Sequence, residues 1–395
     1  MSDLNPGYQY ALTWIRKDWM DKIGAAAPKT MEDVLALAKS FVDADLAGNG
    51  KTIGIEVQND GNFAGNYNSA IEMDPVFNYY NAYPRVWYDD GTGNYVYGST
   101  SQETKKVLGI LTDMYKGGIL AEDFATRDYQ ASIASGNSGI AFGAWWIASW
   151  PLNYTKKNNN DADWQPYICL VSPEGTYNTY NQAYNTMWAV VNAKCKNPEA
   201  LIKLLNASAE AQVSFDGKAL SDEESKAYDL RVPDEVLNAY AGQSNLDWGA
   251  WPTNLTLRFL DQMLKIANQT SEQLKTYRTG STDFSESVLT TLKGITGFEN
   301  GADTGAAAWE AYARYRGMNC MVEMNDILNI KQVFYPPTTD TMELKWSSLK
   351  TLETQSFLKI VMGNEPLDYF DKFVTDWNAQ GGKDIAREVT EQAKR

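Results

Sequence analysis

The stretch YQYALTWIRKDWMDKIGAAAPKTMEDVLALAKSFVDAD, residues 8–45, contains the signals that decide the fold class. YQYALTWI (Tyr8–Ile15) is rich in aromatic and β-favouring residues, which predicts a strand. RKDWMDKIG follows as a short helix that ends at Gly24. The next helix begins at Thr30, a candidate N-cap with Asp33 three residues later, as a capping box requires. Apolar residues then recur at helical spacing: Val34, Leu37, Ala38 and Phe41.

The segments that follow extend this pattern. TIGIEV (Thr52–Val57) predicts a buried strand, so the order strand–helix–strand indicates an α/β architecture. We expect further strands at GIAFG, WQPYICLVS and TMWAVVNAKC, and a hairpin at RVWYDDGTGNYVYG. NYTKKNNNDADW predicts a polar surface loop, and Ser221 to Asn329 is expected to be mostly helical. TMELKWSSLKTLETQSFLKIVMG predicts a long helix that ends at Gly363, and PLDYFDKFVTDWNAQGG predicts a second amphipathic helix.

Length and composition narrow the function classes. A chain of 395 residues predicts two lobes or domains. Its 35 basic and 50 acidic residues give a net charge of −15, which makes nucleic acid and anionic membrane surfaces poor partners. The absence of histidine excludes histidine-based catalysis and histidine metal sites. The three cysteines match no zinc or redox spacing, so neither a metal nor another cofactor is expected.

Three tryptophans lie together in GIAFGAWWIASWP (Gly139–Pro151), directly after a predicted strand. On a helix the adjacent Trp145 and Trp146 would point about 100° apart and would not share one face. At least one of these rings is therefore expected to be exposed, where a flat aromatic surface can hold a ligand.

Four segments resemble, in order, the extracellular solute-binding proteins of carbohydrate type that serve ABC transporters. They are LTWIRKDWMDKIGAAAPKTMEDVLALAKSF, SGNSGIAFGAWWIASWPL, TMWAVVNAKCKNPEALIKLLN and FLKIVMGNEPLDYFDKFVTDWNAQGGKDIAREVTE. In that family the first segment follows the crossover into the second lobe, and the second segment is a strand that ends in a Gly-x-Trp turn. The resemblance is greatest to family 1 proteins of Gram-positive bacteria, which are often lipoproteins.

This resemblance implies a type II periplasmic-binding-protein-like fold, with two lobes joined by a hinge. Residues 8–182 would form the α/β core of the second lobe, 183–329 the remaining helical part of the first lobe, and 330–395 helices that return to the second. The match begins at the crossover, so the first lobe is expected to be incomplete and the chain N-terminally truncated. The signal peptide and lipid-carrying cysteine of full-length, extracellular, membrane-anchored relatives have no counterpart in MSDLNPGYQY.

Sugar rings have apolar faces that stack on aromatic side chains and hydroxyl groups that bind carboxylates and amides. By resemblance Trp145 is the first candidate for a ligand contact and Trp146 the second, whereas Trp150 is expected inside the core. The remaining candidates lie in loops and at a helix start: Phe63, Tyr67, Tyr335, Met342, Trp346 and Trp251, with Trp248 beside the last of these. For each of them, packing in the core or solvation in a loop is the competing interpretation.

The loop DADLAGNGKT (Asp43–Thr52) has some features of a calcium site, with Asp43, Asp45 and Asn49 as oxygen donors. Its spacing is two residues too long, and Gly54 stands where a glutamate is usual. A turn between a helix and a strand is the alternative.

The implied function is binding of an oligosaccharide for an ABC importer, with the ligand held between the lobes by aromatic stacking and no catalysis. Permease subunits are the implied partners, and a monomer is expected. One alternative is a carbohydrate-active enzyme that uses two carboxylates, although no recognisable pair stands at strand ends. Another is a truncated relative that binds nothing.

Overall fold

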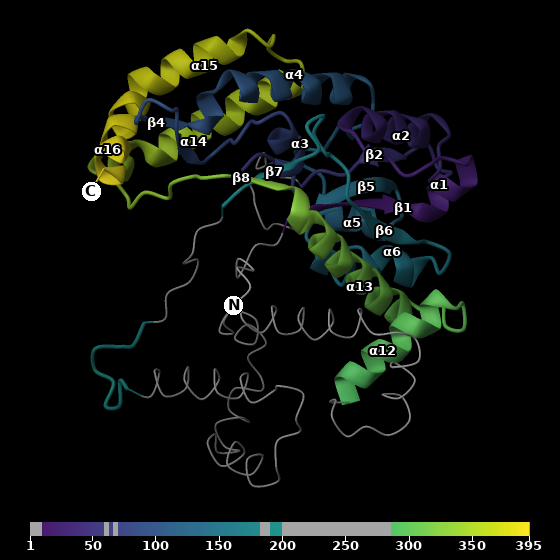
Figure 1. Cartoon of the computed structure of the whole chain (residues 1–395). Helices are drawn as coiled ribbons and strands as arrows, with labels where there is room; N and C mark the ends of the chain where they lie inside the picture. The colour runs from purple at the N-terminus through teal and green to yellow at the C-terminus, as the bar shows by residue number, and fades with distance from the viewer. Residues whose placement is uncertain (1–9, 59–62, 66–69, 182–189, 200–285, 395) are drawn as a thin grey trace. The chain divides into compact units, whose positions relative to one another are not determined.

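The computed structural model describes residues 10–58, 63–65, 70–181, 190–199 and 286–394 (Figure 1). The chain separates into two compact units, one of Met1–Tyr8 with Ala183–Gly294 and one of Gln9–Gln182 with Ile295–Arg395. Most described residues belong to the second unit. The lobe boundaries at residues 183 and 330 stay predictions; the second compact unit resumes at Ile295.

The elements of this unit alternate between strands and helices along the first half of the chain and are mainly helical in the second half. They are, in chain order, β1 (Leu12–Arg16), α1 (Lys17–Ile23), α2 (Met31–Asp43), β2 (Ile53–Ile55), α3 (Asp74–Tyr79), β3 (Trp87–Asp89), β4 (Tyr95–Tyr97), α4 (Gln102–Lys116), α5 (Tyr129–Ala134), β5 (Ser138–Gly143), α6 (Asn153–Asn158), β6 (Trp164–Tyr167), β7 (Tyr177–Tyr180), α12 (Glu286–Glu299), α13 (Ala306–Met324), β8 (Leu328–Lys331), α14 (Asp340–Val361), α15 (Tyr369–Trp377) and α16 (Lys383–Ala393).

The main sheet of the described residues has four strands in the order β2-β5-β1-β6. Strand β1 runs antiparallel to both of its neighbours, and β2 runs parallel to β5. Every residue of β1 is buried, and the Nε1 atom of Trp14 donates to the Gly143 carbonyl oxygen at 3.1 Å. This sheet with helices packed around it confirms the α/β architecture.

Helices α1 and α2 form where the sequence predicts them, and local signals explain their ends. Gly24 ends α1 with a φ of 66°, a conformation that costs glycine little. The Thr30 hydroxyl oxygen accepts a hydrogen bond from the Asp33 amide at 3.2 Å, and the Asp33 carboxylate accepts one from the Thr30 amide at 3.1 Å. A Cβ at Gly139 of β5 would lie 2.5 Å from Phe41 of α2, so this glycine allows the helix to approach the sheet.

Three predicted segments differ from the structure. NYTKKNNNDADW contains helix α6 rather than a loop, because Thr155 turns inward and its hydroxyl donates to the Ile133 carbonyl oxygen. The described part of the range expected to be mostly helical does contain α12 and α13, but its last residues, Leu328 and Asn329, belong to strand β8, which pairs in parallel with β7. The expected strand TMWAVVNAKC lies partly outside the described residues, and its described part, 190–195, contains no strand.

The C-terminal helices α14 and α15 confirm the prediction and pack against each other and against α4 (Figure 1). A buried ion pair connects α14 to the loop before β3. Arg85 Nε donates to Glu353 Oε1 at 2.6 Å, and Arg85 Nη2 donates to the Thr354 hydroxyl at 3.1 Å. Burial raises the pKa of Tyr97 beside this pair well above its ordinary value, and the Glu353 charge raises it further.

Glu56 is a second buried carboxylate, located directly after β2. It is 1% exposed, and its Oε2 atom accepts hydrogen bonds from the Ser132 and Ser138 hydroxyls at 2.7 and 2.5 Å. Burial raises the pKa of this carboxyl, and the two serine hydrogen bonds together with Arg127 oppose that shift.

The buried ion pair leads to a stability prediction. Glu353→Ala leaves the Arg85 guanidinium buried without its carboxylate, so we expect the free energy of unfolding to fall by about 3–5 kcal/mol in urea titrations. The matched control is Asp376→Ala, which removes one partner of the exposed Lys372–Asp376 pair and should change stability little. Equal effects of the two substitutions would contradict the assignment.

Glu56 leads to a prediction of pH dependence. Because its folded pKa is raised, the folded state holds this proton more tightly than the unfolded state does. Its contribution to stability is therefore largest below the unfolded pKa and is lost as the pH rises through the folded pKa. Glu56→Gln removes this dependence, so the stability of the variant relative to the wild type should rise as the pH increases above the ordinary titration range of a glutamate. A pH-independent difference in urea titrations would contradict this.

Candidate ligand site at the end of strand β5

The predicted tryptophan segment begins where β5 ends, beside the start of β1. Leu12 pairs with Gly143, and after an extended Ala144 the chain enters the 3-10 helix η2 (Trp145–Ala148). A Cβ at Gly143 would lie 2.4 Å from the Ala70 carbonyl oxygen, so the strand end is closely approached by another segment. That segment continues alongside β5, where the Glu72 amide donates to the Phe142 carbonyl oxygen at 3.0 Å.

This neighbouring segment brings two carboxylates to the strand end. Glu72 and Asp74 are each 1% exposed, and Asp74 Oδ1 accepts a hydrogen bond from the Gly65 amide at 2.7 Å. Asp74 is the first residue of α3, where a negative charge interacts favourably with the helix dipole. Neither residue is among the candidates that the sequence predicts. The available signal was the acidic pair in IEMDP, which directly follows an asparagine-rich loop.

Tyr177 of β7 lies close to these carboxylates. Its hydroxyl donates to the Ala11 carbonyl oxygen at 2.7 Å, which connects β7 to the start of β1. Burial raises the pKa of Tyr177, and the charges of Glu72 and Asp74 raise it further. The strand-end site, as we call it, comprises the segment Trp145–Trp150 together with Glu72, Asp74 and Tyr177. The tryptophans supply aromatic surface of the kind that stacks on a sugar ring, whereas Glu72, Asp74 and Tyr177 are buried and support the strand end.

The tryptophans of this site are oriented opposite to the prediction. Trp145 is 4% exposed, and α13 packs on it, with the Arg314 guanidinium 5.2 Å from the ring centroid. Trp150, which we expected inside the core, is 37% exposed. It stacks on the half-buried Trp146 with ring centroids 6.3 Å apart and planes 8° from parallel. The exposed aromatic surface is therefore the Trp146–Trp150 pair, because the turn of η2 directs Trp145 inward.

The other predicted ligand residues lie elsewhere in the unit or outside the described residues. Phe63 is 2% exposed and packs edge-on against Phe124. Met342 is buried near the start of α14. Tyr67 and Trp251, together with the neighbouring Trp248, lie outside the described residues.

Tyr335 and Trp346 have partners that are different from those of the buried Trp145. Tyr335 is 41% exposed, and its hydroxyl donates to the Asn181 carbonyl oxygen at 2.9 Å. Trp346 is half-buried in an aromatic cluster, stacked on Trp87 and edge-on to Tyr97. These positions remain unassigned to a ligand.

The loop considered for calcium is closed by its own hydrogen bonds. Asp45 Oδ2 accepts from the Gly50 amide at 2.9 Å, and Oδ1 accepts from the Thr52 hydroxyl at 2.7 Å. Asp43 pairs with Lys39, and the Asn49 amide nitrogen donates to Asn137. Asp43, Asp45 and Asn49 therefore each bind a different partner within the protein. This agrees with the alternative interpretation, in which the loop is a turn between a helix and a strand. Among the described residues, no group of three or more acidic, cysteine or histidine side chains is arranged to hold a metal ion.

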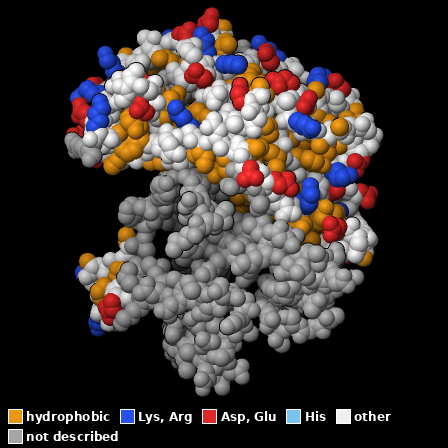
Figure 2. All heavy atoms as spheres, viewed as in Figure 1, with side chains coloured by type: hydrophobic (Ala, Val, Ile, Leu, Met, Phe, Trp, Pro, Cys, Tyr) orange, Lys and Arg blue, Asp and Glu red, His pale blue; other side chains and the backbone are white. Residues whose placement is uncertain are grey.

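Charged side chains of the described residues form no large area of a single sign in the view of Figure 2. Positive and negative side chains are interspersed on the face of the described residues that Figure 2 shows. None of the described helices combines the length and apolar character needed to cross a membrane.

Comparison with known proteins places the chain in a family. A family model described as bacterial extracellular solute-binding protein matches residues 2–213, more than half of the chain. The polygalacturonan/rhamnogalacturonan-binding protein YtcQ of Bacillus subtilis is 27% identical over 137 residues, which are 33% of this chain and 25% of that protein. The aligned part thus spans about a quarter of that relative.

Two solved structures resemble the chain over 98% of its length. The alginate-binding protein AlgQ2, solved without calcium ion, aligns with a TM-score of 0.57 and 14% identity, covering 73% of that chain. An HMO-binding, ABC-transporter-associated solute-binding protein from Bifidobacterium longum infantis aligns with a TM-score of 0.56 and 15% identity, covering 74% of that chain. At these identities the two structures establish the fold. The chain therefore belongs to the bacterial extracellular solute-binding proteins and has their α/β fold.

Proposed function

We propose that this protein binds an oligosaccharide at the strand-end site and presents it to the permease subunits of an ABC importer on the outer side of the membrane. The observation that carries the proposal is an exposed, stacked tryptophan pair beside a strand end, in a chain that belongs to a solute-binding family. The names of the similar proteins support the ligand class, since they describe binding of polygalacturonan, alginate and HMO.

The family binds solutes rather than converting them, so the glycosidase alternative is not retained. The buried carboxylates of the site agree with a binding role without catalysis. Asp74 accepts a hydrogen bond from the Gly65 amide, and this bond fixes the local structure at the strand end.

In the proposed complex the Trp146 and Trp150 rings offer a flat surface to the apolar face of a sugar unit. Trp145 is the first residue of η2, and its ring packs against α13. This contact holds η2, and with it the Trp146–Trp150 pair, in a fixed position. Glu72, Asp74 and Tyr177 position the strand end from the other side. The loop residues Phe63 and Tyr67, and the positions Tyr335, Met342, Trp346 and Trp251, stay predictions for contacts with further sugar units.

The proposal is tested by isothermal titration of the purified chain with galacturonan, alginate and neutral oligosaccharides. We expect saturable binding of at least one of them, with a change in tryptophan fluorescence and no release of new reducing ends. Trp146→Ala should weaken binding about fivefold or more, because truncation of a central aromatic contact typically costs more than about 1 kcal/mol.

The matched control is Tyr369→Ala, which removes a half-buried ring on α15, an element that takes no part in the strand-end site. This variant should bind as the wild type does. If the folded chain binds none of the saccharides, the proposal is wrong. If binding occurs and survives Trp146→Ala, the ligand class stands and the assignment to the strand-end site is wrong.

A further inference from the structure

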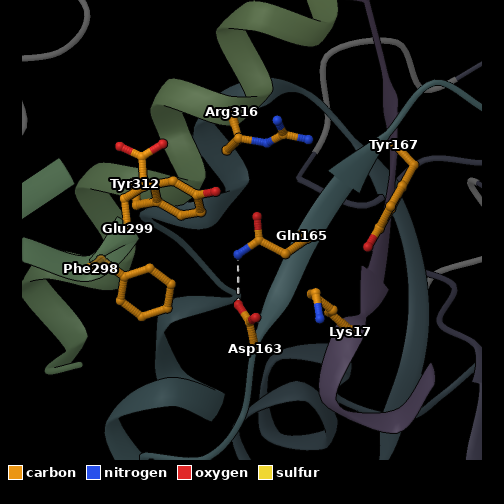
Figure 3. A pocket seen from close by; sticks show the side chains of 8 residues that line it. All are labelled: Lys17, Asp163, Gln165, Tyr167, Phe298, Glu299, Tyr312 and Arg316. Carbon is orange, nitrogen blue, oxygen red and sulfur yellow. Dashed lines mark hydrogen bonds between the residues drawn. The ribbon is translucent and has the colours of Figure 1, made fainter. Parts of the chain in front are cut away.

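A cavity of about 360 Å³ lies beside strand β6, away from the strand-end site (Figure 3). In the sheet order, β6 is an edge strand of the described residues and β1 separates it from β5. The cavity is bordered by Lys17, which follows the last residue of β1, whereas the tryptophan segment lies beside the first residue, Leu12. The cavity therefore lies along the edge strand β6, whereas the tryptophan segment follows β5, an inner strand on the other side of β1.

Strand β6 supplies the floor of this cavity. Asp163, Gln165 and Tyr167 alternate along the chain, so their side chains lie on the same face of the strand. The intervening Trp164 is fully buried on the opposite face. Figure 3 shows the Gln165 and Asp163 side chains in the middle of the cavity, joined by a hydrogen bond from Gln165 Nε2 to Asp163 Oδ1 of 2.6 Å.

Helices α12 and α13 supply an aromatic wall. Tyr312 and Arg316 are one turn apart on α13, and Phe298 near the end of α12 packs against Tyr312 with ring centroids 5.2 Å apart. Tyr167 stands on the other side of Gln165 and Asp163 in Figure 3. A ligand in the cavity would thus meet aromatic surface on two sides and polar atoms between them.

The polar floor is held in place before any ligand arrives. Asp163 Oδ1 accepts a second hydrogen bond, from Trp309 Nε1 at 3.1 Å, so the carboxylate is fixed by two donors. Gln165 and Trp309 both donate to Asp163 Oδ1. The other carboxylate oxygen, Oδ2, is therefore the atom that we expect to accept from a ligand hydroxyl. Burial raises the pKa of the Asp163 carboxyl, in agreement with a site from which water is partly excluded and in which hydrogen bonds are strengthened.

The charges around the cavity balance. Lys17 and Arg316 are matched by Asp163 and Glu299, and Lys17 is already paired with Asp21 at 2.5 Å. A phosphate or a carboxylate would therefore gain little net attraction here. A neutral ring that has apolar faces and hydroxyl edges fits both the aromatic wall and the polar floor.

We propose that this cavity is a second saccharide site, which binds one neutral sugar residue between Tyr312 and Tyr167, with its hydroxyls on Asp163 and Gln165. The volume agrees with the lower end of the range typical of small-molecule sites, roughly 300–1,000 Å³. The inference does not rest on the proposed function, because it uses different residues, which lie along β6 rather than after β5.

The test uses methyl β-D-glucopyranoside and its negatively charged counterpart, methyl β-D-glucuronide, with the whole chain in saturation-transfer NMR. We expect weak, saturable binding of the neutral glycoside, with contact from aromatic protons to the sugar ring. Tyr312→Ala should weaken it at least about fivefold, through loss of the aromatic contact. Gln165→Ala, which leaves the wall intact, should weaken it as well.

Two controls make the result decisive. Tyr315→Ala removes a neighbouring half-buried ring of α13 that does not line the cavity, and it should leave binding unchanged. Trp146→Ala, which tests the strand-end site, should also leave it unchanged. The proposal is overturned if the folded protein does not bind the neutral glycoside, if the glucuronide binds as tightly, or if Trp146→Ala removes the signal while Tyr312→Ala does not.

Discussion

The complete enclosure of strand β1 is the constraint on which the second compact unit depends. The strand pairs with β5 on one side and β6 on the other, and none of its residues is exposed. Trp14 binds the Gly143 carbonyl oxygen and thereby holds the end of β5, from which the tryptophan segment starts. At its other end Arg16 makes two hydrogen bonds to Asp18, and Asp18 in turn accepts from the Asp163 amide. One buried strand thus positions both the strand-end site and the floor of the β6 cavity.

The sequence was informative where structure is local. The Thr30 capping box, the end of α1 at Gly24 and the long helix α14 all depend on residues a few positions apart, and all were predicted. Strand β8 was missed because it pairs with β7, which is about 150 residues away in the chain. The spacing of apolar residues within a short segment does not show which distant segment that segment pairs with. The inward direction of Trp145 was missed for a related reason. Two adjacent tryptophans have the same local pattern whichever of them faces α13.

In the candidate site, too, local features were predicted and contacts between distant segments were not. The resemblance pointed to the segment after Gly143, and a stacked aromatic pair does lie there. It did not indicate Glu72, Asp74 or Tyr177, whose burial results from the close approach of three separate segments. A buried carboxylate requires partners to offset its desolvation, and those partners are visible only after the segments have been brought together.

The ion pair between Arg85 and Glu353 also bears on the timing of folding. Its two residues are 268 positions apart, and the second lies within the last long helix. During synthesis the loop before β3 leaves the ribosome long before its partner exists, so its guanidinium cannot be buried at acceptable cost. The core of this unit is therefore completed only after α14 has emerged.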